Sequence, residues 1–164
     1  MKKKLVFTLI GLSFGLGCDY KPGTHHGSAQ KLEPDPRAGK MWGSDLDAAQ
    51  ARAKTSGKLV FIDFTGSDWC PPCMALHDNV LTQPEFLDYA AKNLELVEID
   101  FPQNKPIDRA VELANKSLAE KYKVQSFPTL IVMDAAGKIL HRDEGYGRKK
   151  AKAFTVDLKA TLGR

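Results

Sequence analysis

The fold of this chain is decided by residues 64–73, which read Phe64-Thr65-Gly66-Ser67-Asp68-Trp69-Cys70-Pro71-Pro72-Cys73. Residues 59–64, which lead into this stretch, are apolar, β-branched or aromatic except for Asp63, so they predict a buried central strand. The residues after Cys73 favour a helix, and prolines are tolerated in a first helical turn because an N–H there has no intrahelical partner. The two cysteines therefore lie at a predicted strand-to-helix junction.

The spacing of Cys70 and Cys73 at this junction indicates redox chemistry. A thiolate at Cys70 would face the positive end of the helix dipole and accept a hydrogen bond from the Cys73 N–H, and both effects lower a thiol pKa. Two other interpretations use the same residues. His77 lies one helical turn after Cys73, so the two cysteines and His77 would supply three ligands of a metal site, but no fourth ligand is visible. An inert structural disulfide would close so short a loop with little gain in entropy.

Length and composition indicate one globular domain without a nucleic-acid partner. The chain has 164 residues, of which 43% are apolar and 27% charged, and these are ordinary globular values. The formal net charge of +4 includes Lys2, Lys3 and Lys4. Without these three lysines, 21 basic residues face 20 acidic ones, so no basic surface for nucleic acid is predicted.

Residues 1–18 predict an export signal, in which the three lysines precede an apolar segment that is too short for a comfortable membrane span. The order Gly15-Leu16-Gly17-Cys18 resembles a bacterial lipobox, with Gly15 where that pattern has leucine, and it implies that Cys18 carries a lipid and anchors the protein to a membrane. Secretion without a lipid and an uncleaved anchor are the alternatives. All three put the folded part outside the cytoplasm, where disulfides persist.

Residues 19–40 predict a flexible tether, because they contain three prolines and several glycines without an apolar period. Residues 41–164 form the predicted domain, with Trp42, Phe61 and Phe64 in its core. Strands are predicted at residues 58–64, 94–100, 129–133 and 139–141, and helices at 45–55, after Cys73, and at 84–92, 107–122 and 149–162. This order predicts an α/β fold, a mixed central β-sheet with helices on both faces.

Local patterns also predict where two helices begin and which face of a third is apolar. Ser44 and Thr82 are expected to cap the helices at 45–55 and 84–92. The helix at 107–122 is expected to bury one apolar stripe, whose members are Ile107, Val111, Leu113, Ala114 and Leu118.

Two motifs beyond the cysteines make the pattern more specific. Ser126-Phe127-Pro128-Thr129 follows some fifty residues after Trp69-Cys70-Pro71-Pro72-Cys73, and an Asp-x-x-Gly-Lys hairpin comes next. Together they resemble a thioredoxin-fold protein. Residues 64–70 with Gln83-Pro84-Glu85-Phe86 resemble in particular the exported thioredoxin-like proteins related to periplasmic disulfide reductases. The resemblance covers residues 41–164 and implies a thioredoxin-like fold.

The resemblance also implies roles for individual residues. Cys70 is the attacking thiolate, Cys73 the resolving thiol, and Pro128 a cis-proline that lets residue 127 offer backbone groups to an extended substrate. Apart from the resemblance, Trp69 and Phe127 are expected to rim the site, and a position in the core alone is the alternative. The implied cofactor is none beyond the Cys70–Cys73 disulfide, and no metal is expected. The implied partners are a substrate protein with a disulfide or dithiol and an upstream dithiol electron donor, and a monomer is expected.

The chain departs from the family pattern near its carboxylate. Asp63 lies seven positions before Cys70, whereas the family has this carboxylate six positions before its first cysteine, and Leu96 stands where a lysine often faces it. A buried Asp63 would have a raised pKa and suit the role of proton acceptor for Cys73, while an exposed or salt-bridged Asp63 would not.

Pro71 and Pro72 bear on the direction of electron flow. Two prolines remove two N–H donors from the loop, which predicts a less stabilised Cys70 thiolate and a more reducing couple. Reduction of substrate disulfides is therefore favoured over oxidation or isomerisation. The alternative function is a tethered module of the same fold that binds peptides or delivers a metal without turning over disulfides.

Overall fold

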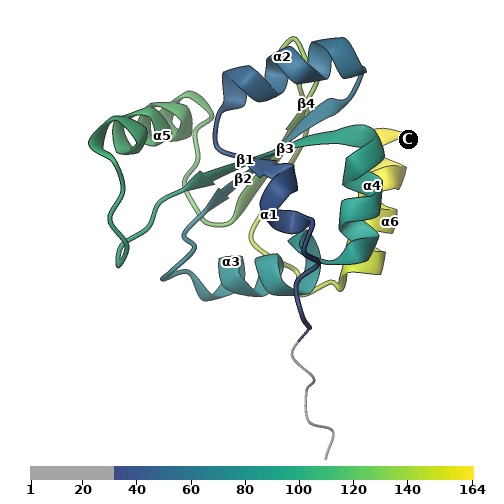
Figure 1. The fold of residues 1–164 in the computed structure, drawn as a ribbon, viewed down its shortest axis with the longest axis horizontal. Coiled ribbons are helices and arrows are strands. Elements are labelled where there is room, and N and C mark those ends of the chain that lie inside the picture. The colour runs from purple at the N-terminus through teal and green to yellow at the C-terminus, as the bar shows by residue number, and fades with distance from the viewer. Residues whose placement is uncertain (1–31) are drawn as a thin grey trace, which may run out of the picture. The chain divides into compact units, whose positions relative to one another are not determined.

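The computed structural model describes residues 32–164, which form both helices and strands (Figure 1). The predicted export signal with Cys18 and most of the predicted tether lie outside these residues. The elements are α1 Ala38–Met41, β1 Trp42–Gly43, α2 Leu46–Ser56, β2 Leu59–Thr65, α3 Pro71–Leu76, the π-helix η1 His77–Leu81, α4 Pro84–Asn93, β3 Leu94–Asp100, α5 Arg109–Lys121, β4 Thr129–Met133, β5 Ile139–Glu144 and α6 Ala151–Leu162.

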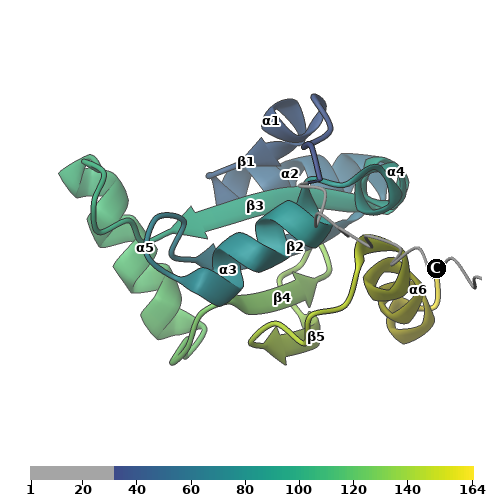
Figure 2. The same cartoon turned by 90° about the horizontal axis from the view of Figure 1, so that it is seen from below.

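The five strands form one mixed sheet in the order β1-β3-β2-β4-β5 (Figure 2). The central strand β2 runs parallel to β3 and antiparallel to β4. All seven residues of β2 are buried, as expected for a strand that is covered on both faces. The predicted α/β class and mixed sheet are confirmed.

Two apolar clusters cover the two faces of the sheet, and alternate residues of β2 belong to each. Phe61 belongs to the cluster with α3, α4 and α6, where Trp42 and Phe86 pack against it with ring centroids 6.0 and 5.4 Å away. Phe64 belongs to the cluster with α2 and faces Tyr122. Figure 1 shows α2 and α3 on opposite sides of the strands. The predicted core positions of Phe61 and Phe64 are confirmed, and Trp42 is partly buried against the cluster that contains Phe61.

The apolar stripe expected on α5 is wrong in part. Val111 and Leu113 are 42% and 51% exposed, whereas Leu118 packs against the cluster on the α2 face. The residue that α5 buries is Asn115, whose Nδ2 donates to the Asp100 carbonyl oxygen at 2.8 Å. A polar contact therefore connects this helix to the end of β3.

Both predicted caps are also wrong. Asp45, not Ser44, precedes α2 and accepts a hydrogen bond from the Ala48 N–H. Gln83 precedes α4 without a side-chain cap, and the Thr82 hydroxyl donates instead to the His77 carbonyl oxygen at 3.0 Å. That bond satisfies a carbonyl of the π-helix, which is a different use of the hydroxyl from a helix N-cap.

The folded part begins before residue 41. The Asp35 N–H donates to the Thr82 carbonyl oxygen at 2.9 Å, and Arg37 forms ion pairs of 2.7 Å with both Asp35 and Asp88. Residues 35–40, assigned to the tether from composition, thus contact the domain. Within residues 32–164, no helix has both the length and the apolar character needed to cross a membrane.

Candidate active site

The two cysteines are joined as a disulfide at the start of α3, with their Cα atoms 5.3 Å apart. Cys70 occupies the N-cap position, Pro71 and Pro72 are the first helical residues, and the Cys70 Sγ accepts a hydrogen bond from the Cys73 N–H at 3.4 Å. The predicted strand-to-helix junction is confirmed. Both cysteines are largely covered, with 4% of Cys70 and 2% of Cys73 exposed.

The loop between β2 and Cys70 is bound to the segment that follows β3. Asp100 accepts hydrogen bonds from the Ser67 N–H at 2.9 Å and the Ser67 hydroxyl at 2.6 Å. The Asp68 carboxylate accepts two more from the N–H groups of Gln103 and Asn104, and these bonds, the Gln103 one foremost, lower the pKa of Asp68. These four hydrogen bonds hold the loop against the end of β3 and the residues after it.

The sequence did not single out Ser67, Asp68 and Asp100. A signal was present, because carboxyl ends of adjacent parallel strands meet at one edge of a sheet, and both of these ends carry polar residues.

Trp69, which precedes Cys70, contacts Phe127. Their rings meet edge to face with centroids 5.8 Å apart, and the Trp69 Nε1 donates to the Phe101 carbonyl oxygen at 2.7 Å. Gly66 lies under the indole, since a Cβ built there would come within 2.6 to 2.8 Å of the Trp69 ring. Gly66 thus leaves the space that Trp69 occupies.

The Phe127–Pro128 peptide bond is cis, as the resemblance implied. Thr129 pairs with Phe64 in the antiparallel register of β2 and β4. Pro128 therefore lies at the end of β2 from which the cysteine loop departs, next to the strand that carries Asp63.

Asp63 is buried, so the alternatives of an exposed or salt-bridged carboxylate are wrong. Only 3% of the residue is exposed, and its Oδ1 has no hydrogen-bond partner among residues 32–164. It lines a cavity of about 450 Å³ together with Cys73. Burial, followed by the negative charges of Glu98 and Asp100, raises the pKa of Asp63 well above its usual value. This side chain is thus a buried carboxyl next to the second cysteine.

The residue that pairs with Asp63 along β3 is Glu98, whereas Leu96 pairs with Phe61. Glu98 lines the same cavity, and burial, followed by the charge of Asp100, raises the pKa of Glu98. The resemblance to the family had placed Leu96, not Glu98, opposite the Asp63 carboxylate. Alternation along β3 was the signal that could have found Glu98, because Leu94, Leu96 and Glu98 share one face of a strand.

Comparison with known proteins agrees with this geometry. A family described as "Thioredoxin-like domain" matches residues 46–156. The chain belongs to this thioredoxin-like family. It is 35% identical over 133 residues to the disulfide bond reductase DsbH of Chlamydia pneumoniae, a match that covers 81% of this chain and 79% of that protein.

Other relatives support the same assignment for this thioredoxin-like protein. The thioredoxin-related protein DsbJ of Chlamydia pneumoniae is 26% identical over 109 residues, which cover 66% of this chain and 31% of DsbJ. A solved structure of a DsbH oxidoreductase superposes with a TM-score of 0.70 at 32% identity, covering 81% of this chain and 88% of that one. The protein is a thiol–disulfide oxidoreductase of the thioredoxin type, with Cys70 and Cys73 as its CxxC pair.

The metal interpretation of the site finds no support in residues 32–164 of this thioredoxin-like protein. No three His, Cys, Asp or Glu side chains gather there in an arrangement that could hold a metal ion. The ring of His77 is half exposed, and its Nδ1 lies 3.0 Å from the Asp78 carboxylate.

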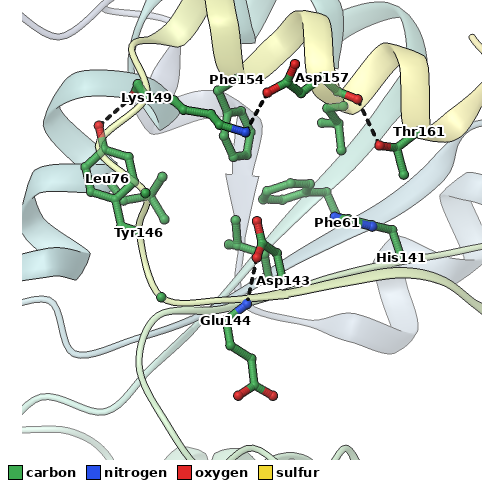
Figure 3. A pocket seen from close by; sticks show the side chains of 14 residues that line it. Phe61, Leu76, His141, Asp143, Glu144, Tyr146, Lys149, Phe154, Asp157 and Thr161 are labelled. Carbon is green, nitrogen blue, oxygen red and sulfur yellow. Dashed lines mark hydrogen bonds and ion pairs between the residues drawn. The ribbon is translucent and has the colours of Figure 1, made fainter.

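A second cavity, of about 340 Å³, lies between β5 and α6 in the thioredoxin-like domain. Its walls combine the apolar side chains of Phe61, Leu76 and Phe154 with an ion pair of 2.6 Å between Lys149 and Asp157, and Figure 3 shows that pair across the cavity from His141 and Asp143. Neither cysteine lines this cavity, whereas Cys73 lines the cavity that contains Asp63.

The contact between Gly66 and the indole makes a testable prediction. In Gly66→Ala the added methyl group overlaps the indole, so Trp69 moves and its hydrogen bond to Phe101 is lost. Such a bond contributes about 1 kcal/mol to stability, so Gly66→Ala should be less stable by about that amount, and the displaced indole should slow the reduction of a protein disulfide. Tryptophan fluorescence and the rate measure the effect. Gly39→Ala, where nothing lies within 4 Å, is the matched control, and equal rates in both variants would contradict the prediction.

The buried carboxyl makes a second prediction, on stability. A raised folded-state pKa means that the folded protein binds the proton more tightly than the unfolded chain does, so the free energy of unfolding falls as the pH rises above the unfolded value of about 3.9. Asp63→Asn has no ionisable group at this position, so its free energy of unfolding does not fall for this reason as the pH rises. The variant is expected to be more stable by roughly 1–3 kcal/mol at pH 7.

The gain from Asp63→Asn should shrink toward zero below about pH 4, where the unfolded carboxyl is itself protonated. Urea unfolding at several pH values measures it. A gain that is equal at pH 3 and pH 7 would show that the charge of Asp63 is not its cause.

Proposed function

We propose that this thioredoxin-like protein reduces disulfides of exported proteins, with Cys70 as the attacking thiolate and Cys73 as the resolving thiol. The observation that carries the proposal is the position of the two sulfur atoms. Cys70 caps α3 and receives the Cys73 N–H, whereas Cys73 lines the cavity that contains Asp63. The first position stabilises a thiolate, and the second gives a buried thiol a proton acceptor.

The reaction has two exchange steps. In the first, the Cys70 thiolate attacks a substrate disulfide, forms a mixed disulfide and releases one substrate thiolate. In the second, Asp63 takes the proton of Cys73, and the resulting thiolate attacks the Cys70 Sγ and releases the other substrate thiolate. The substrate gains two electrons and the protein ends with the Cys70–Cys73 disulfide. An upstream dithiol must then reduce this disulfide for the next cycle.

The substrate is proposed to bind along the edge formed by Trp69, Phe127 and Pro128. The edge-to-face contact of Trp69 with Phe127 gives an apolar rim. Phe127 lies two residues before Thr129, the first residue of β4. An extended peptide there would meet the backbone of residue 127 as well as the two rings, which combines strand-like hydrogen bonding with apolar contact.

The prolines support the reducing direction. The N–H of Cys73 is the donor to the Cys70 Sγ, and Pro71 and Pro72 have no N–H to add. A thiolate with fewer donors is less stabilised, so the reduced form gives up its electrons more readily. The 35% identity to a protein named disulfide bond reductase supports the same direction.

The proposed location is outside the cytoplasm, with the domain held to a membrane by a lipid on Cys18. The support is the sequence of residues 1–18 and the presence of a redox-active disulfide. The domain is proposed to act as a monomer. The alternative is a peptide-binding or metal-delivery module without turnover, and the Cys70–Cys73 disulfide and the identity to a disulfide bond reductase favour turnover over it.

Replacement of the cysteines tests the two sulfur roles. Cys70→Ser should abolish reduction of insulin disulfides, while Cys73→Ala should stop after the first exchange and accumulate mixed disulfides with substrate proteins. Non-reducing electrophoresis with mass spectrometry identifies the trapped species. Mixed disulfides formed through Cys73 in a Cys70→Ser variant would reverse the assignment of the two roles.

The redox potential tests the direction. Equilibration with glutathione should give a value nearer the about −270 mV of thioredoxin than the about −120 mV of the strong oxidant DsbA. Pro71→Gly and Pro72→Gly return one donor each, so each should make the potential less negative. A wild-type value close to that of DsbA would refute a reductase and favour an oxidase.

Asp63→Asn tests the proton acceptor. The second exchange step should slow by about tenfold or more, because the Cys73 proton then has to pass to solvent. In the wild type, the rate should fall as the pH drops below the raised pKa of Asp63, since a protonated carboxyl cannot accept a proton. An unchanged rate and pH profile in Asp63→Asn, measured by stopped-flow decay of the mixed disulfide, would exclude the role.

A further inference from the structure

Two carboxyl side chains share the cavity behind Cys73. Asp63 on β2 and Glu98 on β3 are register partners in the parallel pair, and neighbouring strands are about 4.8 Å apart. Both residues line the cavity that Cys73 also lines. A carboxyl group that faces another across adjacent strands is a different situation from the single buried carboxyl that the sequence suggested.

The surroundings of the pair contain more negative than positive charge. From β3, Asp100 also faces the cavity, but its two oxygens accept the hydrogen bonds from Ser67. From the π-helix, His77 and Asp78 line the cavity, and Lys105 lines it from the loop after β3. His77 and Lys105 act on Glu98 and lower its pKa, although burial and Asp100 outweigh them. The charges that act on Asp63 are those of Glu98 and Asp100, and both raise its pKa after burial.

The positions of the charges therefore separate the two carboxyls. Lys105 and His77 lower the pKa of Glu98, whereas Asp63 is buried and its Oδ1 has no hydrogen-bond partner in the described part of the chain. When two carboxyl groups occupy one site, the charge on the first opposes ionisation of the second, and the two titrate as a coupled pair.

We propose that Glu98 is a positioning residue for the proton transfer. Its negative charge favours the protonated form of Asp63 over the pH range in which the two carboxyl groups together hold one proton. The proposal rests on Asp63 as the acceptor for the Cys73 proton. Glu98 touches no reacting atom and acts through the charge it places opposite Asp63. It thereby sets the lowest pH at which Asp63 can accept the proton of Cys73.

Removal of the Glu98 charge has a definite sign. In Glu98→Gln the side chain keeps its shape and loses its charge, so one of the causes that raise the pKa of Asp63 disappears. Asp63 then ionises at lower pH. The second exchange step should become faster on the acidic side of the profile, and slower at the alkaline plateau because a carboxylate of lower pKa is a weaker base.

The protonation state of Asp63 is measured directly by carbon-13 NMR of side-chain carboxyl groups in the oxidised protein, with Asp63→Asn used to assign the signal. The Asp63 midpoint should move to lower pH in Glu98→Gln. It should stay in place in Glu95→Gln, the matched control, because Glu95 lies on the same strand but pairs with Arg52 and Lys58. Glu98→Asp keeps a charge and should restore most of the wild-type midpoint. An unchanged Asp63 midpoint in Glu98→Gln would overturn the proposal.

A measurement on the wild type covers the case in which a variant does not fold. Coupled carboxyls each show two titration steps, so the signals of Asp63 and Glu98 should both be biphasic, and two single-step curves would overturn the coupling. The proposed acceptor role fails separately. If the exchange rate of Asp63→Asn equals that of the wild type while the NMR midpoints shift as stated, the two carboxyls are coupled but Asp63 does not serve the reaction.

Discussion

The parallel pairing of β2 with β3 is the constraint on which the rest of the site depends. It runs without a break from Leu59 opposite Leu94 to Thr65 opposite Asp100. Because the two strands end together, the cysteine loop and the segment after β3 leave the sheet side by side and exchange hydrogen bonds. The same register sets Glu98 against Asp63. A shift of one residue would turn Asp63 to the opposite face and away from α3.

Much of this arrangement could be predicted from residues that act locally. The apolar runs fixed β3 and β4 at their observed bounds and β2 to within one residue, and the prolines placed the cysteines at the first turn of a helix. The cis bond before Pro128 was available only through resemblance to a family, because nothing in the local sequence distinguishes a cis from a trans proline with certainty.

The features that could not be predicted depend on contacts between segments distant in the sequence. The exposure of Val111 and Leu113 follows from where α5 meets the sheet, which one helical pattern does not contain. The Thr82 hydroxyl does not cap α4 because it donates to the His77 carbonyl oxygen of the preceding π-helix. Alternation along β3 places Glu98 on the same face as Leu94 and Leu96, but its position opposite the buried carboxyl of Asp63 follows from the register of β2 and β3.

The contact between Asp35 and Thr82 has a mechanical consequence. Thr82 follows directly on α3 and η1, whose 11 residues connect it to Cys70, and a helix of that length spans about 17 Å. A pull on the chain before Asp35 is therefore received by the Thr82 backbone and by the ion pair of Arg37 with Asp88. The force therefore acts on the domain at the end of the helical segment that is distant from the disulfide, and not on the loop that holds Trp69.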